Sequence, residues 1–414
     1  MKTSPVSINY QITILNNLFR SDLSQNQLKT IAKEVLHSNK VQSHYKFQAS
    51  KVLCSDEVCY SDEDLDISLN WGGNGQVVVI NKKSAVFKME GGNGSIYEVK
   101  GDLLSETETK TVELAQKVFK DKQGISSAES GASILNWIWS WCPKDKTSQF
   151  IRPPVTIGES QYLDLYTDDV SNLYNFPDIP LQQLYENFAA SADALGHLGL
   201  KGVVYLDYKA ENLLFEERNG QFSPFFSMTD FDGVVRIPIE EKDLTEAVLA
   251  PLKSIQKKER SWPPFPSLEI NNEVSEIIGD EEFNIFHIWA MKALCKADPQ
   301  QQLECFAQAV QALQKMQSFL FGHALLDPFL SLGDPSNWSP FKVRNCFIIN
   351  EEELLTGFSI DALQSELEAI GGPRFFNLLK QLTNFNPEQR MPLDQAAIVL
   401  RELAGQQSLQ NGWN

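Results

Sequence analysis

Cysteine is scarce in this chain and is not arranged for metal binding. Six cysteines are spread over 414 residues, and no two of them form a C-x-x-C pair. Because a structural zinc site draws its ligands from such closely spaced pairs, this spacing excludes a zinc-binding domain. Isolated cysteines in a long chain are typical of free thiols in a reducing compartment. They are Cys54, Cys59, Cys142, Cys295, Cys305 and Cys346.

Long apolar runs are also missing. No stretch of the sequence approaches the roughly 18 consecutive apolar residues that a membrane-spanning helix needs. The first residues, Met1 to Val6, lead into a polar segment without the apolar core of a secretory signal. We therefore expect a protein that is soluble as synthesised. It is either cytoplasmic or exported by a route that does not use a signal peptide.

Basic residues are fewer than acidic residues in this chain. Lysine and arginine number 36 against 54 aspartates and glutamates, which gives a net charge of -18. A surface of this sign repels phosphate polymers, so the sequence excludes a general binder of nucleic acid or of anionic membranes. With 42% apolar and 22% charged residues, the composition is otherwise that of a globular protein. The length allows one bilobal unit or two domains.

The amino-terminal part of the chain changes from a helical to a strand-like pattern. Residues 1–64 read as a helical extension, because apolar residues recur at helical spacing between Leu28 and Val35. Its last residues, 61–64, form an acidic run that predicts a solvated linker. Three strands are expected over 67–71, 76–80 and 85–89, with turns at 72–75 and 81–84. A second glycine cluster follows at 91–94.

The middle of the chain predicts further elements of both kinds. A helix is expected from Ser105 to Lys120, because Ser105 can serve as its N-cap and acidic residues follow. Two strands are expected around Gly158, then an amphipathic helix from Leu181 to Leu200 and a hairpin at Asn219-Gly220. Beyond residue 273 the pattern is helical to the end. The sequence therefore predicts an α+β fold with two lobes, a strand-rich half before a helical half, and a cleft between them.

The richest chemistry lies between residues 205 and 233. Tyr205-Leu206-Asp207-Tyr208-Lys209-Ala210-Glu211-Asn212 contains the spacing D-x-K-x-x-N, and Asp230 follows in Asp-Phe-Asp-Gly. A single loop of this kind can aim a carboxylate, an ammonium group and an amide at one phosphate. Phosphoryl transfer needs a carboxylate to orient a hydroxyl, oxygen ligands for magnesium and cations along the phosphate. The alternative interpretation is a loop whose Asp and Asn only cap turns.

These residues resemble the catalytic loop and D-F-G segment of eukaryotic-type protein kinases. The resemblance implies that Asp207 is the catalytic base and that Lys209 neutralises the transferred phosphate. Asn212 and Asp230 would hold Mg²⁺, and ATP would be the phosphate donor. It implies a bilobal protein-kinase-like fold, with an N-lobe over residues 65–168 and a C-lobe over 169–405. Residues 406–414 form a tail.

The resemblance also assigns nucleotide contacts. Ala85-Val86-Phe87-Lys88 is similar to the V-A-I-K strand of kinases, so Lys88 is expected to pair with the α- and β-phosphates. Glu108, on the helix expected from Ser105, would be the partner of that lysine, in preference to Glu106 and Glu113. The remaining contacts with ATP are expected from a glycine turn and two apolar side chains, namely Gly72, Gly73, Gly75, Leu165 and Leu214.

The carboxy-terminal residues are similar to the last helices of the kinase fold. Asn386-Pro387-Glu388-Gln389-Arg390 matches the D-P-x-x-R segment, and Arg390 is expected to pair with Glu269 at the end of the activation segment. Residues 298–370 are longer than this lobe normally has, and we interpret them as a helical insertion that binds a regulatory partner. Tyr205-Leu206 replaces His-Arg before the base, which predicts activity that does not depend on phosphorylation of the activation loop. Asp232 replaces the glycine of D-F-G.

The function predicted on this basis is an ATP- and Mg²⁺-dependent protein Ser/Thr kinase. Lys209 favours a protein substrate, since small-molecule kinases of related fold usually lack it. The enzymatic alternatives are a lipid or small-molecule substrate, and transfer of AMP instead of phosphate. A pseudokinase scaffold is the non-catalytic alternative. Divergent kinases of this kind are known among effectors that intracellular bacteria inject into host cells, which would make the substrate a host protein.

Overall fold

The chain folds into two compact units. The first unit comprises Met1–Trp141 and Arg152–Leu165, and the second comprises Cys142–Ile151 and Tyr166–Asn414. Strands dominate the first unit and helices dominate the second, so the prediction of an α+β protein is confirmed in this coarse form. The computed structural model describes residues 24–38, 41–54, 59–71, 76–90, 94–141, 154–175, 179–218, 221–223, 226–253, 255, 280–332, 346–349 and 355–411.

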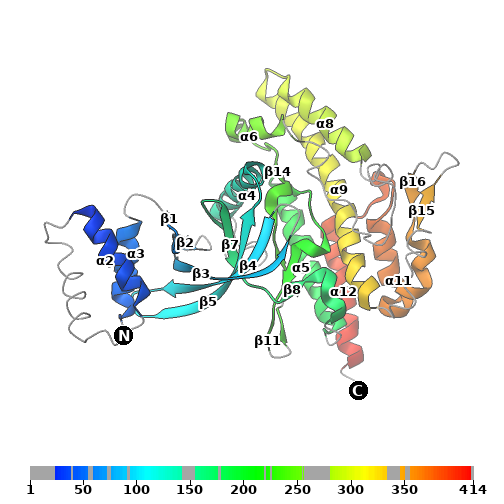
Figure 1. The fold of residues 1–414 in the computed structure, drawn as a ribbon. Coiled ribbons are helices and arrows are strands. Elements are labelled where there is room, and N and C mark those ends of the chain that lie inside the picture. The colour runs from blue at the N-terminus through cyan, green and yellow to red at the C-terminus, as the bar shows by residue number, and fades with distance from the viewer. Residues whose placement is uncertain are drawn as a thin grey trace. The chain divides into compact units, whose positions relative to one another are not determined.

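The first unit is built on one seven-stranded sheet (Figure 1). Its strand order is β1-β2-β3-β4-β5-β7-β6, and every neighbouring pair is antiparallel. A helix, α4 (Lys122–Trp141), connects β5 to β6. The strands are β1 (Cys59–Ser61), β2 (Leu65–Trp71), β3 (Gln76–Glu90), β4 (Gly94–Leu104), β5 (Thr109–Phe119), β6 (Val155–Ile157) and β7 (Ser160–Asp164).

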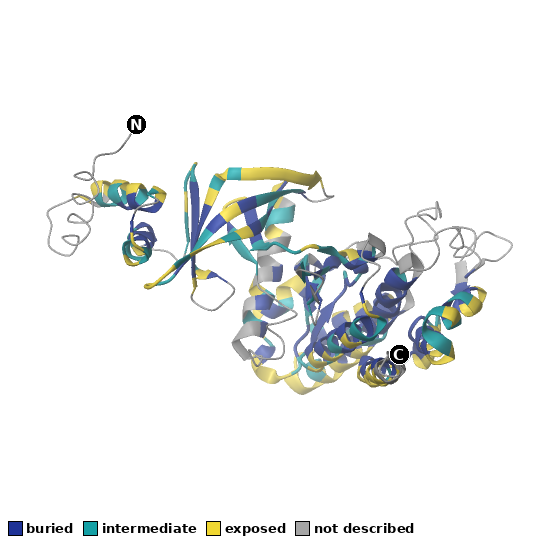
Figure 2. Ribbon diagram, turned by 90° about the horizontal axis from the view of Figure 1, so that it is seen from below, coloured by how far each residue is buried: buried dark blue, intermediate teal, exposed yellow. Residues whose placement is uncertain are grey.

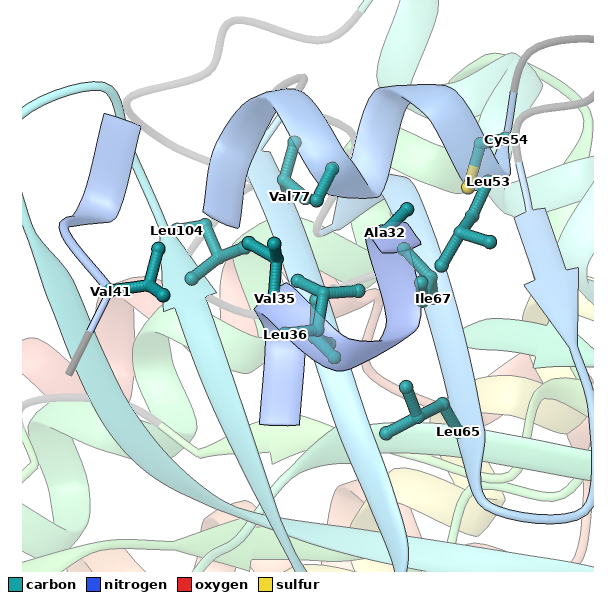
Figure 3. Close-up of a cluster of buried hydrophobic side chains, with 12 residues drawn as sticks. Ala32, Val35, Leu36, Val41, Leu53, Cys54, Leu65, Ile67, Val77 and Leu104 are labelled. Carbon is teal, nitrogen blue, oxygen red and sulfur yellow. The ribbon is translucent and has the colours of Figure 1, made fainter. Parts of the chain in front are cut away.

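Two amino-terminal helices pack on one face of this sheet. They are α2 (Gln25–His37) and α3 (Ser43–Leu53). Ala32 and Val35 are fully buried, which confirms the amphipathic helix expected there. Figure 3 shows these side chains meeting those of the strands beneath them. The sheet contributes Leu65, Ile67, Val77, Val79 and Leu104 to this core.

The helix expected from Ser105 to Lys120 is wrong. Ser105 begins a turn: its backbone N–H donates to the Glu108 carbonyl at 2.9 Å, and its Oγ accepts from the Glu108 N–H at 3.0 Å. The chain then continues as β5, which is paired with β4 along its whole length. The serine therefore caps a hairpin. Residues Glu113 to Gln116 suit a helix by local propensity, and pairing on both sides of β5 overrides that preference.

The turn expected at residues 81–84 is also wrong, because β3 runs through it without a break. The pairing of β3 with β4 shifts register between Asn81 and Val86. Within this irregularity the Ser84 Oγ donates to the Asn81 carbonyl at 2.7 Å and accepts from the Lys100 N–H at 2.7 Å. The polar residues therefore form a bulge inside a long strand. The outer half of β3, coloured as exposed in Figure 2, extends beyond the core.

The acidic run at 61–64 is the turn between β1 and β2, and it is not a solvated linker. The Asp62 carboxylate accepts hydrogen bonds from the Asp64 and Leu65 N–H groups, both at 2.8 Å. It also forms an ion pair with Lys33 of α2. The helical extension is therefore held against the sheet by apolar packing and by the ion pair between Lys33 and Asp62.

The second unit is mostly helical. The expected helix α5 (Leu181–Leu200) and the hairpin of β11 (Glu217–Arg218) with β12 (Gln221–Phe222) are confirmed. The described residues of the region 298–370 include a long helix, a strand pair and the start of a further helix. The other helices are α6 (Glu246–Leu252), α8 (Asp280–Leu294), α9 (Pro299–Leu332), α11 (Gln364–Leu382) and α12 (Leu393–Asn411), and the strand pair is β15 (Phe347–Ile349) with β16 (Leu355–Phe358).

Arg390 lies in a buried ion pair, but with a partner that was not expected. Its guanidinium contacts the Glu282 carboxylate of α8, and the two side chains are only 2% and 3% exposed. Further donors of Arg390 reach the carbonyls of Asn384, Lys315 and Phe385 at 2.6–3.1 Å. Glu269, the predicted partner, lies outside the described residues. The buried guanidinium thus donates to Glu282 and to three backbone carbonyls.

None of the helices in the described ranges combines the length and apolarity needed to cross a bilayer.

Candidate functional site

Three predicted residues meet in one loop of the second unit. The Lys209 Nζ lies 3.2 Å from one carboxylate oxygen of Asp207, and the Asn212 Nδ2 donates to the other at 2.7 Å. The same amide nitrogen donates to the Asp207 carbonyl at 2.8 Å. The spacing D-x-K-x-x-N therefore brings an ammonium group and an amide onto one carboxylate. Asp207 keeps 22% of its side chain exposed, so the group remains accessible.

Short strands hold this loop between its neighbours. Before Asp207, β9 (Val203–Tyr205) pairs with β14 (Val234–Arg236). After Asn212, β10 (Leu213–Phe215) pairs with β13 (Ser227–Met228) and with β8 (Asp168–Asp169). Because β13 and β14 flank Asp230, the two ladders place the Asp230 segment directly beside the Asp207 loop.

Asp230 has an unusual backbone conformation. Its φ is 56°, and among the described residues no other non-glycine has a positive φ. Such a conformation costs energy and persists only where the surroundings fix it. The Tyr205 hydroxyl donates to the Thr229 carbonyl and lies 3.2 Å from the Asp230 carbonyl, and its ring stacks on Phe231 at 5.4 Å. Tyr205, at the position of the expected histidine, therefore anchors the strained segment to the loop.

The charges around Asp207 are balanced against one another. Burial raises the pKa of Asp207 above its usual value, and the negative charge of Asp230 adds to the rise. Lys209 and the Asn212 hydrogen bond act in the opposite direction. A carboxylate with a raised pKa accepts a proton more readily than an exposed one. The arrangement can orient a hydroxyl group and stabilise an anion beside it.

A second group of carboxylates lies close to this loop. Burial, together with the charges of Glu211 and Asp169, raises the pKa of Asp327 in α9 to about 7. Burial also raises the pKa of Glu211, with smaller contributions from Asp169 and Asp207. The folded protein therefore binds a proton at Asp327 in a pH range where the unfolded chain has already released it.

This gives a pH-dependent prediction for stability. The wild type should lose stability as the pH rises from about 4, the pKa of the unfolded side chain, to about 7, the pKa in the fold. Asp327→Asn removes this loss, so we expect it to stabilise the protein at pH 8 by about 2 kcal/mol, after allowance for partial solvation. Urea unfolding at pH 4 and pH 8 measures the difference. An equal effect at both pH values would contradict the assignment.

Lys88 occupies the exposed outer half of β3. Its side chain is 49% exposed, and its Nζ pairs with Glu98 of β4 at 2.5 Å. Glu108 is exposed in the turn before β5, so it is not on a helix, and it lies at the end of β4 opposite to the residues that pair beside Lys88. The structure thus separates the lysine and glutamate that were expected to pair, because the helix that would have carried the glutamate is a strand.

Lys117 of β5 was not predicted as a site residue from the sequence. In the sheet it has a paired strand on each side. It pairs in register with Ile96 of β4 and Gln161 of β7. Its neighbours on this face include Ala115 and Met89, since residues paired across strands share a face. The pattern Ala115-Gln116-Lys117, in a strand followed by a helix, could have identified Lys117 as a candidate for the phosphate-binding lysine.

The other predicted contacts are only partly described. Gly72, Gly73 and Gly75, between β2 and β3, lie outside the described residues. Leu165 is half-buried at the end of the first unit, and Leu214 is half-buried in β10. The second glycine cluster joins β3 to β4, and there a Cβ on Gly94 would lie 2.5 Å from the Val118 carbonyl oxygen of β5. Glycine at 94 therefore allows β4 and β5 to approach each other closely.

The donor atoms near Asp207 suit a hard cation. Carboxylate and amide oxygens of Asp230 and Asn212 are ligands that Mg²⁺ prefers, and Mg²⁺ is usually bound by one or two carboxylates with water and substrate phosphates completing the shell. In the part of the chain that the structure describes, no group of three or more His, Cys, Asp or Glu side chains could hold a metal alone. The oxygens of Asp230 and Asn212 fit an ion that takes its remaining ligands from water and a phosphate.

Comparison with known proteins gives no match: no family model fits the chain, and no curated protein is similar to it.

Proposed function

We propose that the protein is an ATP- and Mg²⁺-dependent phosphotransferase with a bilobal, protein-kinase-like fold. The observation that carries the proposal is the contact of Lys209 and Asn212 with the two oxygens of Asp207, beside the strained Asp230. A carboxylate, a cation and a pair of oxygen ligands are the groups that phosphoryl transfer requires. Burial raises the pKa of Asp207, which suits a group that takes a proton from a hydroxyl.

Each residue of the loop has a distinct role in this proposal. Asp207 orients the acceptor hydroxyl and receives its proton, and Lys209 neutralises the negative charge on the transferred phosphate. Asn212 and Asp230 supply oxygen ligands to Mg²⁺, which offsets the charge of the phosphates when it is bound. Tyr205 acts through Asp230 by holding its backbone, so it is a positioning residue.

We propose Lys117, in place of Lys88, as the lysine that contacts the phosphates of ATP. Lys117 is paired with β4 on one side and β7 on the other, and its surroundings on that face are partly exposed and apolar, with Ala115 and Ile96 beside it. Such a surface suits a purine with a cation at one edge.

Two matched substitutions distinguish the lysines. We expect Lys117→Met to reduce ATP-dependent phosphate transfer at least about 100-fold, since an electrostatic contact to the transferring phosphates is lost. Lys88→Met should change the rate less than about threefold, because it breaks only an exposed ion pair. Initial rates of ADP formation with and without Mg²⁺ test both. A larger loss from Lys88→Met than from Lys117→Met would reverse the assignment.

The acceptor is proposed to be a Ser or Thr hydroxyl of a protein. Lys209, two residues after Asp207, is the feature that favours it over a small-molecule acceptor. Transfer of AMP and a non-catalytic scaffold remain the competing proposals, and they predict a different label in the product or no label at all.

A further inference from the structure

The second unit contains a cavity that none of the proposed phosphotransfer residues lines. Its volume is about 650 Å³, within the range of sites for small organic ligands. One wall is the face of α5 from Asp193 to Leu200, and another is the face of α9 from Gln311 to Ser318. Residues 387–394, which lead into α12, close the third side.

The charged side chains of this cavity are paired, with one exception. Asp193 pairs with Arg401, Lys315 with Glu388, and Arg390 with Glu282. Asp394 also lines the cavity, is exposed, and has no cationic partner in the described part of the chain. One negative charge therefore remains at the edge of the cavity.

The inner wall carries a buried amide. Gln317 lines the cavity and is 1% exposed, and its Nε2 lies 3.4 Å from the carbonyl of Tyr205, just before Asp207. Its Oε1 is enclosed by the protein, and within the described residues nothing donates a hydrogen bond to it. The apolar part of the lining includes Leu195, Leu200 and Leu393.

We propose that this cavity binds a cationic amphipathic small molecule, with an apolar body and one protonated amine. The apolar body lies against Leu200 and Leu393, and the amine supplies the positive charge that Asp394 lacks. This site is independent of the proposed phosphotransfer chemistry, since binding to it requires neither ATP nor Asp207.

Calorimetric titration of the full chain with diphenylpropylamine tests the proposal. Diphenylpropanol and diphenylpropionate, which have the same body with a neutral or negative group, serve as matched probes. We expect the amine to bind best and the carboxylate at least about tenfold more weakly, because the carboxylate faces Asp394 and finds no free cation. Equal affinity for amine and carboxylate would overturn the choice of ligand.

Two variants locate the binding. Gly196→Leu fills the cavity from α5, where an added Cβ has its nearest neighbours at 4.0 Å, and leucine favours a helix over glycine. We expect it to abolish binding while thermal unfolding remains cooperative. Asp394→Asn, on the surface, should weaken amine binding about threefold. The control Ile398→Ala, exposed on the same helix, should not change it. Amine binding that survives Gly196→Leu would show attachment elsewhere on an acidic protein and would refute the site.

Discussion

Asp207→Ala should lower the rate of phosphate transfer by about 10³-fold, the usual contribution of a positioned general base. The substitution removes the carboxylate that Lys209 and Asn212 both contact, so no other group in the loop can orient the acceptor hydroxyl. The stability of the protein should change little in comparison, because burial disfavours the ionised form of this side chain. Steady-state rates with saturating ATP, measured beside thermal unfolding, separate the two effects.

Asp207→Asn is the matched control for this experiment. It keeps the shape of the side chain and removes its basicity, so a comparable loss is expected if the carboxylate acts as a base. Full activity in Asp207→Asn would mean that the side chain only shapes the loop. A preparation in which Asp207→Ala and the wild type transfer phosphate at the same rate would contradict the named base.

Arg390→Ala should destabilise the second unit by about 3–5 kcal/mol, the usual cost of removing one partner from a buried ion pair. The substitution leaves the Glu282 carboxylate, 3% exposed, without its cation. It also removes the hydrogen bonds that the carbonyls of Asn384, Phe385 and Lys315 accept from the guanidinium. Urea unfolding followed by circular dichroism measures the loss.

Arg401→Ala provides the comparison for Arg390→Ala. Arg401 forms an ion pair with Asp193, but these side chains are 50% and 47% exposed, so we expect a loss below about 1 kcal/mol. The double variant Arg390→Met with Glu282→Leu should recover much of the stability, because it leaves no charge unpaired in the interior. Equal losses for Arg390→Ala and Arg401→Ala would be incompatible with the buried pair.

The parts that could be predicted from the sequence depend on local geometry. Asp207, Lys209 and Asn212 lie within six residues, so their contacts follow from one loop whatever surrounds it. The helix Leu181–Leu200 could be predicted equally well, since its buried residues repeat at helical spacing over five turns. The structure confirms which face of this helix is apolar, because Tyr185, Phe188 and Leu195 are fully buried.

The parts that could not be predicted depend on distant partners. Residues 109–119 form a strand only because β4 and β7 pair with both of its edges. A helix predicted for these residues leaves Lys117 off any strand, so the sequence-based prediction of the phosphate-binding lysine was Lys88. The partner of Arg390 is 108 residues away in the chain, and no local pattern marks Glu282 as the residue that meets it.

Incubation with Mg²⁺ and ATP carrying a label on either the γ- or the α-phosphate tests the central claim most directly. A protein acceptor mixture is added, and label bound to protein is measured for the wild type and for Asp230→Asn. We expect γ-label on Ser or Thr, no α-label, and loss of the γ-label in Asp230→Asn. Incorporation of α-label, or no incorporation by the wild type, would contradict it.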